Sequence, residues 1–187
     1  RKNTLPLLHI AELNRAIPFQ LVTGGQMVSL AGSDLQLDLT STRLLFNKGR
    51  AAGELQIQFM PFEHLHTPIM PGALPFWMFA GQPKGVLAEG AMGINIKMPA
   101  KNGTYDYIPE GTQYVVLLGY DPEQEVIKPV GVGKIDNYRV ISQGKVNVAS
   151  LDYLGYALVD PKHQPLLQQV AAGQKSLHEL ISAVTEK

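Results

Sequence analysis

The sequence predicts a mainly β protein, an antiparallel β-sandwich followed by helices at its C-terminus. Short apolar runs alternate with polar residues over the first 160 positions, which is typical of strands with one solvent-facing side. Gly, Pro, Asp and Asn separate these runs as turn residues. After Asp160-Pro161 the sequence becomes rich in Leu, Gln and Ala, which favours helix. We therefore expect three parts: an N-terminal segment at 1–17, a β-sandwich at 18–160 and a helical appendage at 161–187.

The N-terminal segment carries the pattern of a short helix. Leu7, Leu8 and Ala11 share one face at helical spacing, and Pro6 and Pro18 bracket the stretch. We expect this helix within residues 4–17.

The first half of the predicted sandwich reads as a series of short strands. Gly24-Gly25 is a hairpin-type turn and is expected to pair the two strands that flank it. In the fifth strand, Leu55, Ile57 and Phe59 alternate with glutamines and are expected to point inward. The strands are expected at 19–22, 27–30, 35–39, 42–46, 55–59 and 76–79.

Residues 60–90 are irregular and hold five prolines. A long loop within a compact domain is often where function resides, so we expect a functional role there. Alternation resumes at Ala91–Met98, where every second residue is Met or Ile, which places these four side chains on one face.

The stretch from Gly111 to Ile141 predicts a β-meander at the centre of the fold. A run of Tyr, Val and Leu at Tyr114–Gly119 fits a largely buried strand, and a turn follows at 120–123. A second strand is expected at Val126–Lys134, and a third begins at Tyr138. One or two further strands are expected within 146–159.

The C-terminus predicts two helices, the first at 164–172 and broken by Gly173. Ser176 and Glu179 have the spacing of a capping box, which marks the start of the second helix. That helix carries an apolar stripe, which we expect to dock on the domain's own sheet, with a neighbouring subunit or domain as the alternative. The stripe, a possible partner interface, comprises Leu177, Leu180, Ile181 and Val184.

Composition excludes several classes of protein. The 187 residues include 16 basic and 16 acidic side chains, so the net charge is zero and a nucleic-acid binder is not expected. The chain has no cysteine, which excludes disulfides and Cys-based metal sites. No apolar run approaches the length of a membrane span. Because the chain begins with Arg1, we expect a processed or excised piece of a longer protein.

Several short motifs in the middle of the chain resemble a module of large bacterial surface proteins. They are Met70-Pro71-Gly72, Leu87 to Met92, Pro109 to Thr112, Gly119-Tyr120-Asp121 and Pro129 to Gly133. The module is related to carboxypeptidase-regulatory-like β-sandwich domains and to a domain of teneurins and cartilage intermediate layer proteins. The family pattern has an aromatic residue where this chain has Lys128-Pro129. Over about residues 18–160, the resemblance implies a scaffold or adhesive role without catalytic residues.

Two groups of side chains are candidates for a binding site. In an extended segment His64 and His66 point the same way and form a weak metal candidate, whereas Glu63 points to the opposite face. A second group of aromatic residues could form a platform for a sugar or instead fill the core beneath the long loop. This group comprises Trp77, Phe76, Phe79, Tyr105 and Tyr107.

No nucleophile, base and orienting group can be assembled from the sequence, so we expect no enzymatic activity, no cofactor and no bound metal. We expect a structural or adhesive module of a larger envelope or extracellular protein, whose partners are other domains or subunits of the same surface assembly. The alternatives are a carbohydrate-binding module and a hydrolase whose site is not visible in the sequence. A periplasmic location is compatible with the same features.

Overall fold

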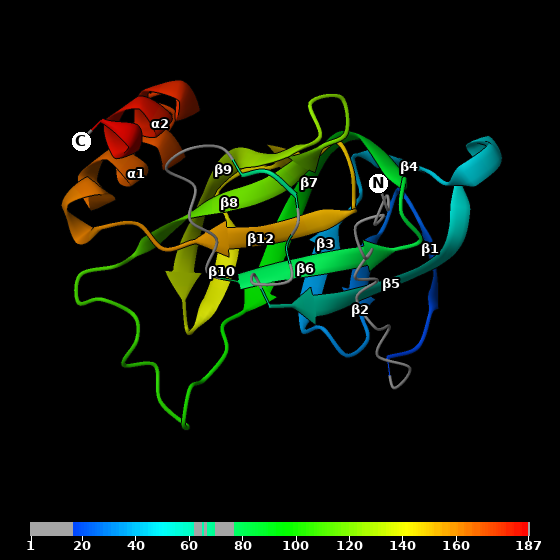
Figure 1. Cartoon of the computed structure of the whole chain (residues 1–187), viewed down its shortest axis with the longest axis horizontal. Helices are drawn as coiled ribbons and strands as arrows, with labels where there is room; N and C mark the ends of the chain where they lie inside the picture. The colour runs from blue at the N-terminus through cyan, green and yellow to red at the C-terminus, as the bar shows by residue number, and fades with distance from the viewer. Residues whose placement is uncertain (1–16, 62–64, 66, 70–76, 187) are drawn as a thin grey trace, which may run out of the picture.

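The computed structural model describes residues 17–61, 65, 67–69 and 77–186. The strands join in one continuous sheet in the order β1-β5-β6-β12-β8-β9-β10-β7-β3-β2, which curls into a nearly closed barrel (Figure 1). This confirms the prediction of a mainly antiparallel β protein. The sandwich is only partly confirmed, because the strands connect into a single barrel-like sheet.

The strand bounds are close to those predicted, although several strands are longer. The first six strands are β1 (Gln20–Thr23), β2 (Met27–Leu30), β3 (Leu35–Asp38), β4 (Thr42–Leu45), β5 (Ala52–Met60) and β6 (Trp77–Gln82). The other six are β7 (Leu87–Lys97), β8 (Tyr114–Asp121), β9 (Val126–Asp136), β10 (Arg139–Ser142), β11 (Val146–Asn147) and β12 (Tyr153–Ala157). In the part of the chain that the structure describes, the connections also contain the short 3-10 helices η1 (Asn47–Gly49) and η3 (Pro161–His163).

The predicted hairpin around Gly24-Gly25 is wrong, because β1 pairs with β5 and β2 pairs with β3. The reason lies in the turn itself. The Gly25 amide donates to the Leu39 carbonyl at 2.8 Å, and a Cβ on Gly24 would lie 2.2 Å from the Thr42 carbonyl oxygen. The turn is therefore held against the β3–β4 connection, and each flanking strand finds another partner.

The two ends of the sheet approach each other at β1 and β2. The side-chain amide of Gln20 in β1 donates to the Ser29 carbonyl at 3.1 Å and accepts from the Ala31 amide at 3.3 Å. One side chain therefore bridges the edges that the backbone leaves unpaired, which is why the barrel is nearly closed.

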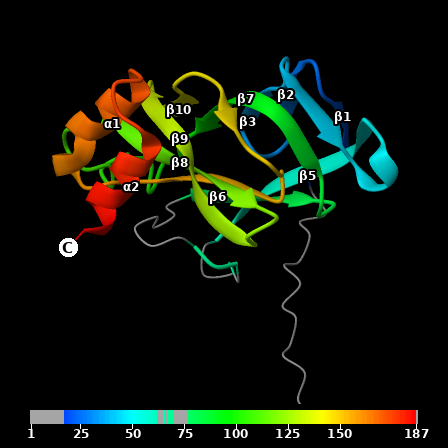
Figure 2. The ribbon, with the colours of Figure 1, turned by 90° about the horizontal axis from the view of Figure 1, so that it is seen from above.

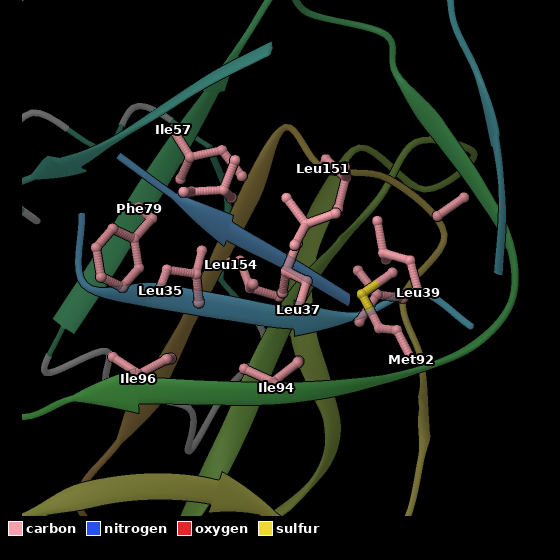
Figure 3. Close-up of a cluster of buried hydrophobic side chains, with 14 of the residues drawn as sticks. Leu35, Leu37, Leu39, Ile57, Phe79, Met92, Ile94, Ile96, Leu151 and Leu154 are labelled. Carbon is pink, nitrogen blue, oxygen red and sulfur yellow. The ribbon is translucent and has the colours of Figure 1, made fainter. Parts of the chain in front are cut away.

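The barrel interior holds the main hydrophobic core. Met92, Ile94, Ile96 and Met98 of the β7 segment are all buried, which confirms their predicted common face. Figure 3 shows Phe79, Leu35 and Ile96 gathered at one end of this cluster and Leu39 and Met92 at the other.

A second core lies on the outer face of the sheet, beneath the helices α1 (Gln164–Ala171) and α2 (Leu177–Thr185) (Figure 2). Strand β8 serves both cores, because Val115 and Leu117 point into the barrel whereas Val116 and Leu118 lie beneath the helices. This double burial explains why the β8 sequence is an almost continuous apolar run.

The helices are fastened to the sheet at their start. Gln164 accepts hydrogen bonds from the amides of Gln113 and Tyr114 at 2.9 and 2.8 Å and donates to the Tyr114 carbonyl at 2.9 Å. The predicted capping box of Ser176 and Glu179 is present at the start of α2. Neither helix in the described part of the chain has the length and apolar character needed to cross a membrane.

Candidate binding groove at the mouth of the barrel

Four strands bring their ends together at one end of the barrel, which we call the mouth. Strand β5 ends there at Met60 and β6 begins there at Trp77, in a register that places Phe59 opposite Phe79. Strand β7 ends there at Lys97, beside the start of β3. Side chains that point inward at this end reach the opening of the barrel.

A groove of about 400 Å³ lies at the mouth, within the range usual for small-molecule sites. Its walls come from the β2–β3 turn, from β5, from β6 and from the segment that follows β7. The lining residues are Gly32, Ser33, Asp34, Phe59, Trp77, Phe79, Lys97, Met98, Pro99, Ala100 and Tyr105.

Three aromatic rings form one wall of the groove. Phe59 stacks on Trp77, with ring centroids 3.9 Å apart and an interplanar angle of 19°. Trp77 meets Phe79 edge to face at 6.4 Å. Phe79 is buried in the barrel core, whereas Phe59 is 42% exposed. The aromatic wall therefore extends from a ring buried in the core, Phe79, to a ring that faces solvent, Phe59.

The connection between β7 and β8, residues 98–113, forms the opposite wall and projects at the lower left of Figure 1. Tyr105 of this loop stacks on Tyr138, with centroids 3.8 Å apart and an interplanar angle of 10°. The Tyr107 hydroxyl donates to the Pro99 carbonyl at 2.6 Å. The loop therefore holds a defined shape although it has almost no regular secondary structure.

Tyr156 connects this loop to the barrel core. Its fully buried ring belongs to the main cluster, and its hydroxyl hydrogen-bonds that of Tyr107. Burial raises the pKa of Tyr107 to about 12, and burial together with the neighbouring Tyr107 raises the pKa of Tyr156 further. Both hydroxyls are therefore neutral at physiological pH and are suited to hold the loop in place.

The charged side chains of the groove are Asp34 and Lys97. The Lys97 ammonium lies 4.0 Å from the Asp34 carboxylate, and both side chains are more than half exposed. The Lys97 amide also donates to the Asp34 carbonyl at 3.2 Å, which holds the two backbones together. The groove thus combines aromatic rings with a donor and an acceptor at its rim.

Three of the aromatic residues predicted from the sequence line this groove, namely Trp77, Phe79 and Tyr105. Tyr107 supports its wall, and Phe76 lies outside the described residues. The structure brings these side chains together from β6 and from the long loop that follows β7.

Phe59 and Tyr138 also take part in this site, and the sequence did not identify either as a site residue. Phe59 was expected to be buried as the third inward residue of its strand, but β5 ends at the mouth and leaves its ring exposed. Phe59 is the last inward residue before an irregular stretch, and this position was the sequence signal that its ring lies at the end of the barrel. Nothing local marks Tyr138 as a partner of Tyr105, since the two residues meet through the fold alone.

His64 and His66, the weak metal candidates, lie outside the described residues. Within the described ranges, no three His, Cys, Asp or Glu side chains are grouped so that they could hold a metal ion. Two aspartates hold turns rather than a metal: Asp38 accepts from the Thr40 amide, and Asp121 accepts from the amides of Glu123 and Gln124. The Thr40 hydroxyl and amide together lower the pKa of Asp38, and the Lys128 ammonium, with these two amides, lowers the pKa of Asp121.

The stripe on α2 faces the chain's own sheet. Leu180 is 1% exposed and belongs to the second core, and Leu177 and Val184 pack against that core. Ile181 is half-buried. The stripe thus occupies the first of its two predicted destinations.

A larger groove of about 470 Å³ runs over the outer face of β1 and β5, where Phe19 and Leu21 meet Arg50 and Glu54. It lies apart from the aromatic residues of the mouth. We favour the mouth as the binding site because stacked rings and polar groups converge there.

Comparison with protein-family models, with curated proteins and with solved structures finds no match to this chain. Function is therefore argued from the groove itself.

Proposed function

We propose that this chain is a non-catalytic adhesive module of a larger bacterial envelope or surface protein, and that it binds carbohydrate through the groove at the mouth. The observation that carries this proposal is the convergence of Trp77, Phe79 and Tyr105 on one groove. In such a module, the barrel is a rigid scaffold for the groove, and other domains of the same assembly are its neighbours.

The aromatic wall suits a sugar ring. One face of a pyranose carries mainly C–H groups, and these pack on the flat apolar face of Trp or Tyr. Phe59 and Trp77 support each other by stacking, so the exposed ring is held in one orientation. A ring that is already ordered loses little conformational entropy when a ligand binds, which favours affinity.

The rim of the groove supplies the polar contacts that a sugar also needs. Hydroxyl groups both donate and accept hydrogen bonds, and the Asp34 carboxylate and the Lys97 ammonium offer one partner of each kind. The adhesive role also agrees with the resemblance to bacterial surface modules, which implies a location in the envelope or outside the cell.

A glycan array with Trp77→Ala tests the proposal. The wild-type protein is expected to bind a defined set of glycans, and the variant is expected to bind them at least about tenfold more weakly because the stacking wall is lost. Tyr120→Ala is the matched control, since Tyr120 is also half-buried and lies edge to face with Tyr153, away from the groove.

Two outcomes would overturn parts of this proposal. If the wild-type protein binds no glycan, the carbohydrate assignment is wrong and the structural role alone is left. If a bound oligosaccharide is cleaved, so that new reducing ends accumulate, the hydrolase alternative replaces the non-catalytic one.

A further inference from the structure

Two opposite charges stand at the rim of the groove, and the inference drawn from them rests on the proposed carbohydrate binding. Asp34 lies in the β2–β3 turn, and Lys97 is the last residue of β7. Among the described lining residues, they are the two with charged side chains, and their charges cancel.

The distance between the side chains of Asp34 and Lys97 leaves both of them able to bind a ligand. At 4.0 Å the ammonium and the carboxylate are farther apart than the 2.7–3.2 Å of a direct hydrogen bond, which is an approximate range for such bonds. An ammonium has three donors and a carboxylate has several acceptor sites, so a loose pair retains unused capacity. Exposed pairs of this kind contribute little to stability, so a ligand can displace their contact at small cost.

We propose that the groove selects uncharged sugars and that Asp34 and Lys97 together bind a pair of adjacent hydroxyl groups on the sugar. One hydroxyl donates to the Asp34 carboxylate and its neighbour accepts from the Lys97 ammonium. A charged sugar is repelled by one of the two groups as it is attracted by the other, so it gains no net electrostatic attraction, whereas two neutral hydroxyls satisfy both groups.

The test uses a glycan array that carries uncharged, acidic and amino oligosaccharides, with Asp34→Asn and Lys97→Gln as variants. Asn accepts the left-handed backbone of position 34, where φ is 51°. The wild-type protein is expected to bind uncharged glycans. Each variant is expected to bind those glycans about tenfold more weakly, because a hydrogen bond to a charged group is replaced by a weaker one to a neutral amide.

The variants should also change selectivity in opposite directions. Asp34→Asn leaves Lys97 unpaired and is expected to gain acidic glycans, whereas Lys97→Gln is expected to gain amino glycans. Glu89→Gln is the matched control, since Glu89 pairs with Arg43 at 3.9 Å with similar exposure and neither residue lines the groove. This variant should bind as the wild type does.

The outcomes separate this inference from the function on which it rests. If Trp77→Ala abolishes binding but both rim variants retain wild-type affinity and selectivity, the role of the ion pair is wrong and carbohydrate binding stands. If the wild-type protein binds mainly charged glycans, the inference is also wrong. If no glycan binds, both proposals fail.

Discussion

Apolar side chains of the sheet lie beneath helices in one region of the molecule and face solvent in another. On the outer face of β8 and β9, Val116 and Leu118 lie beneath α1 and α2, where Leu180 is almost fully buried. At the mouth, Phe59 is 42% exposed, and within the described residues no helix covers it. The covered region therefore stabilises the fold, whereas the exposed rings at the mouth remain accessible to the ligand that we propose.

Leu180→Asp should give the largest effect, because it places a carboxylate in the covered region. We expect unfolding to become easier by more than about 3 kcal/mol, from the lost packing of a buried leucine and the cost of burying a polar group. Urea denaturation measures this change. His178→Asp, on the exposed side of the same helix, is the control and should have little effect.

The mass of the protein in solution tests whether the stripe on α2 is buried within one chain. Leu180→Asp is expected to leave the oligomeric state unchanged in light scattering. A variant that keeps its stability but loses a dimer or a bound partner would show that the stripe on α2 is an interface. That result would contradict the expectation that the stripe is buried within one chain.

Ser176→Ala removes the cap of α2 and should give an intermediate effect. The Ser176 hydroxyl accepts from the Glu179 amide at 3.1 Å, and loss of such a cap typically costs about 1 kcal/mol. Amide hydrogen exchange in α2 is expected to accelerate, while exchange in the barrel is expected to change little. Ser176→Asp, which keeps an acceptor at the cap, should restore protection, and equal exchange in both variants would contradict this role.

Phe59→Ala should destabilise the fold less than its size suggests, because its ring is substantially exposed at the mouth. We expect a loss of about 1 kcal/mol, mainly from the stack on Trp77, against the roughly 3–5 kcal/mol usual for a buried phenylalanine. Thermal unfolding measures the difference. A loss as large as that of a buried phenylalanine would show that Phe59 belongs to the core. The contrast between a covered region and an exposed mouth would then be wrong.

A moderately alkaline pH, just above 10, should give the smallest effect and should act at the mouth. The pKa of Tyr107 is raised to about 12 in the folded protein, above its ordinary value of 10.0, so its contribution to stability is complete below pH 10 and is lost as the pH rises toward 12. A pH titration of the unfolding free energy should show this decline. Tyr107→Phe should make the decline less steep without removing it, because burial also raises the pKa of Tyr156. An unchanged slope in the variant would exclude Tyr107 as a cause.

Much of the strand pattern followed from the sequence, because alternation and turn residues are local properties. The buried face of the β7 segment and the Ser176 cap were both predicted from spacing alone. The closure into a barrel was not predicted, since it depends on pairings between strands far apart in the chain, such as β3 with β7. The failed hairpin at Gly24-Gly25 shows the same limit, because contacts with Leu39 and Thr42 override a local turn preference.

The candidate site was only partly predictable, because residue type is a local property whereas the meeting of distant residues depends on the fold. Trp77, Phe79 and Tyr105 were identifiable as large amphipathic or apolar rings near an irregular stretch. Their meeting with Phe59 and with the Asp34–Lys97 pair depends on four strand ends that share one end of the barrel. Residue type therefore indicated the members, and topology assembled the groove.

The attachment of the helices through Gln164 has a mechanical consequence. A force on the C-terminal end of the described chain acts first on α2 and α1, and it must break the three hydrogen bonds of Gln164 before β8 is disturbed. Further along the chain it reaches β12, which is hydrogen-bonded to β6 on one edge and to β8 on the other. For a force applied at this end, we therefore expect the helices to detach from the sheet before β12 does.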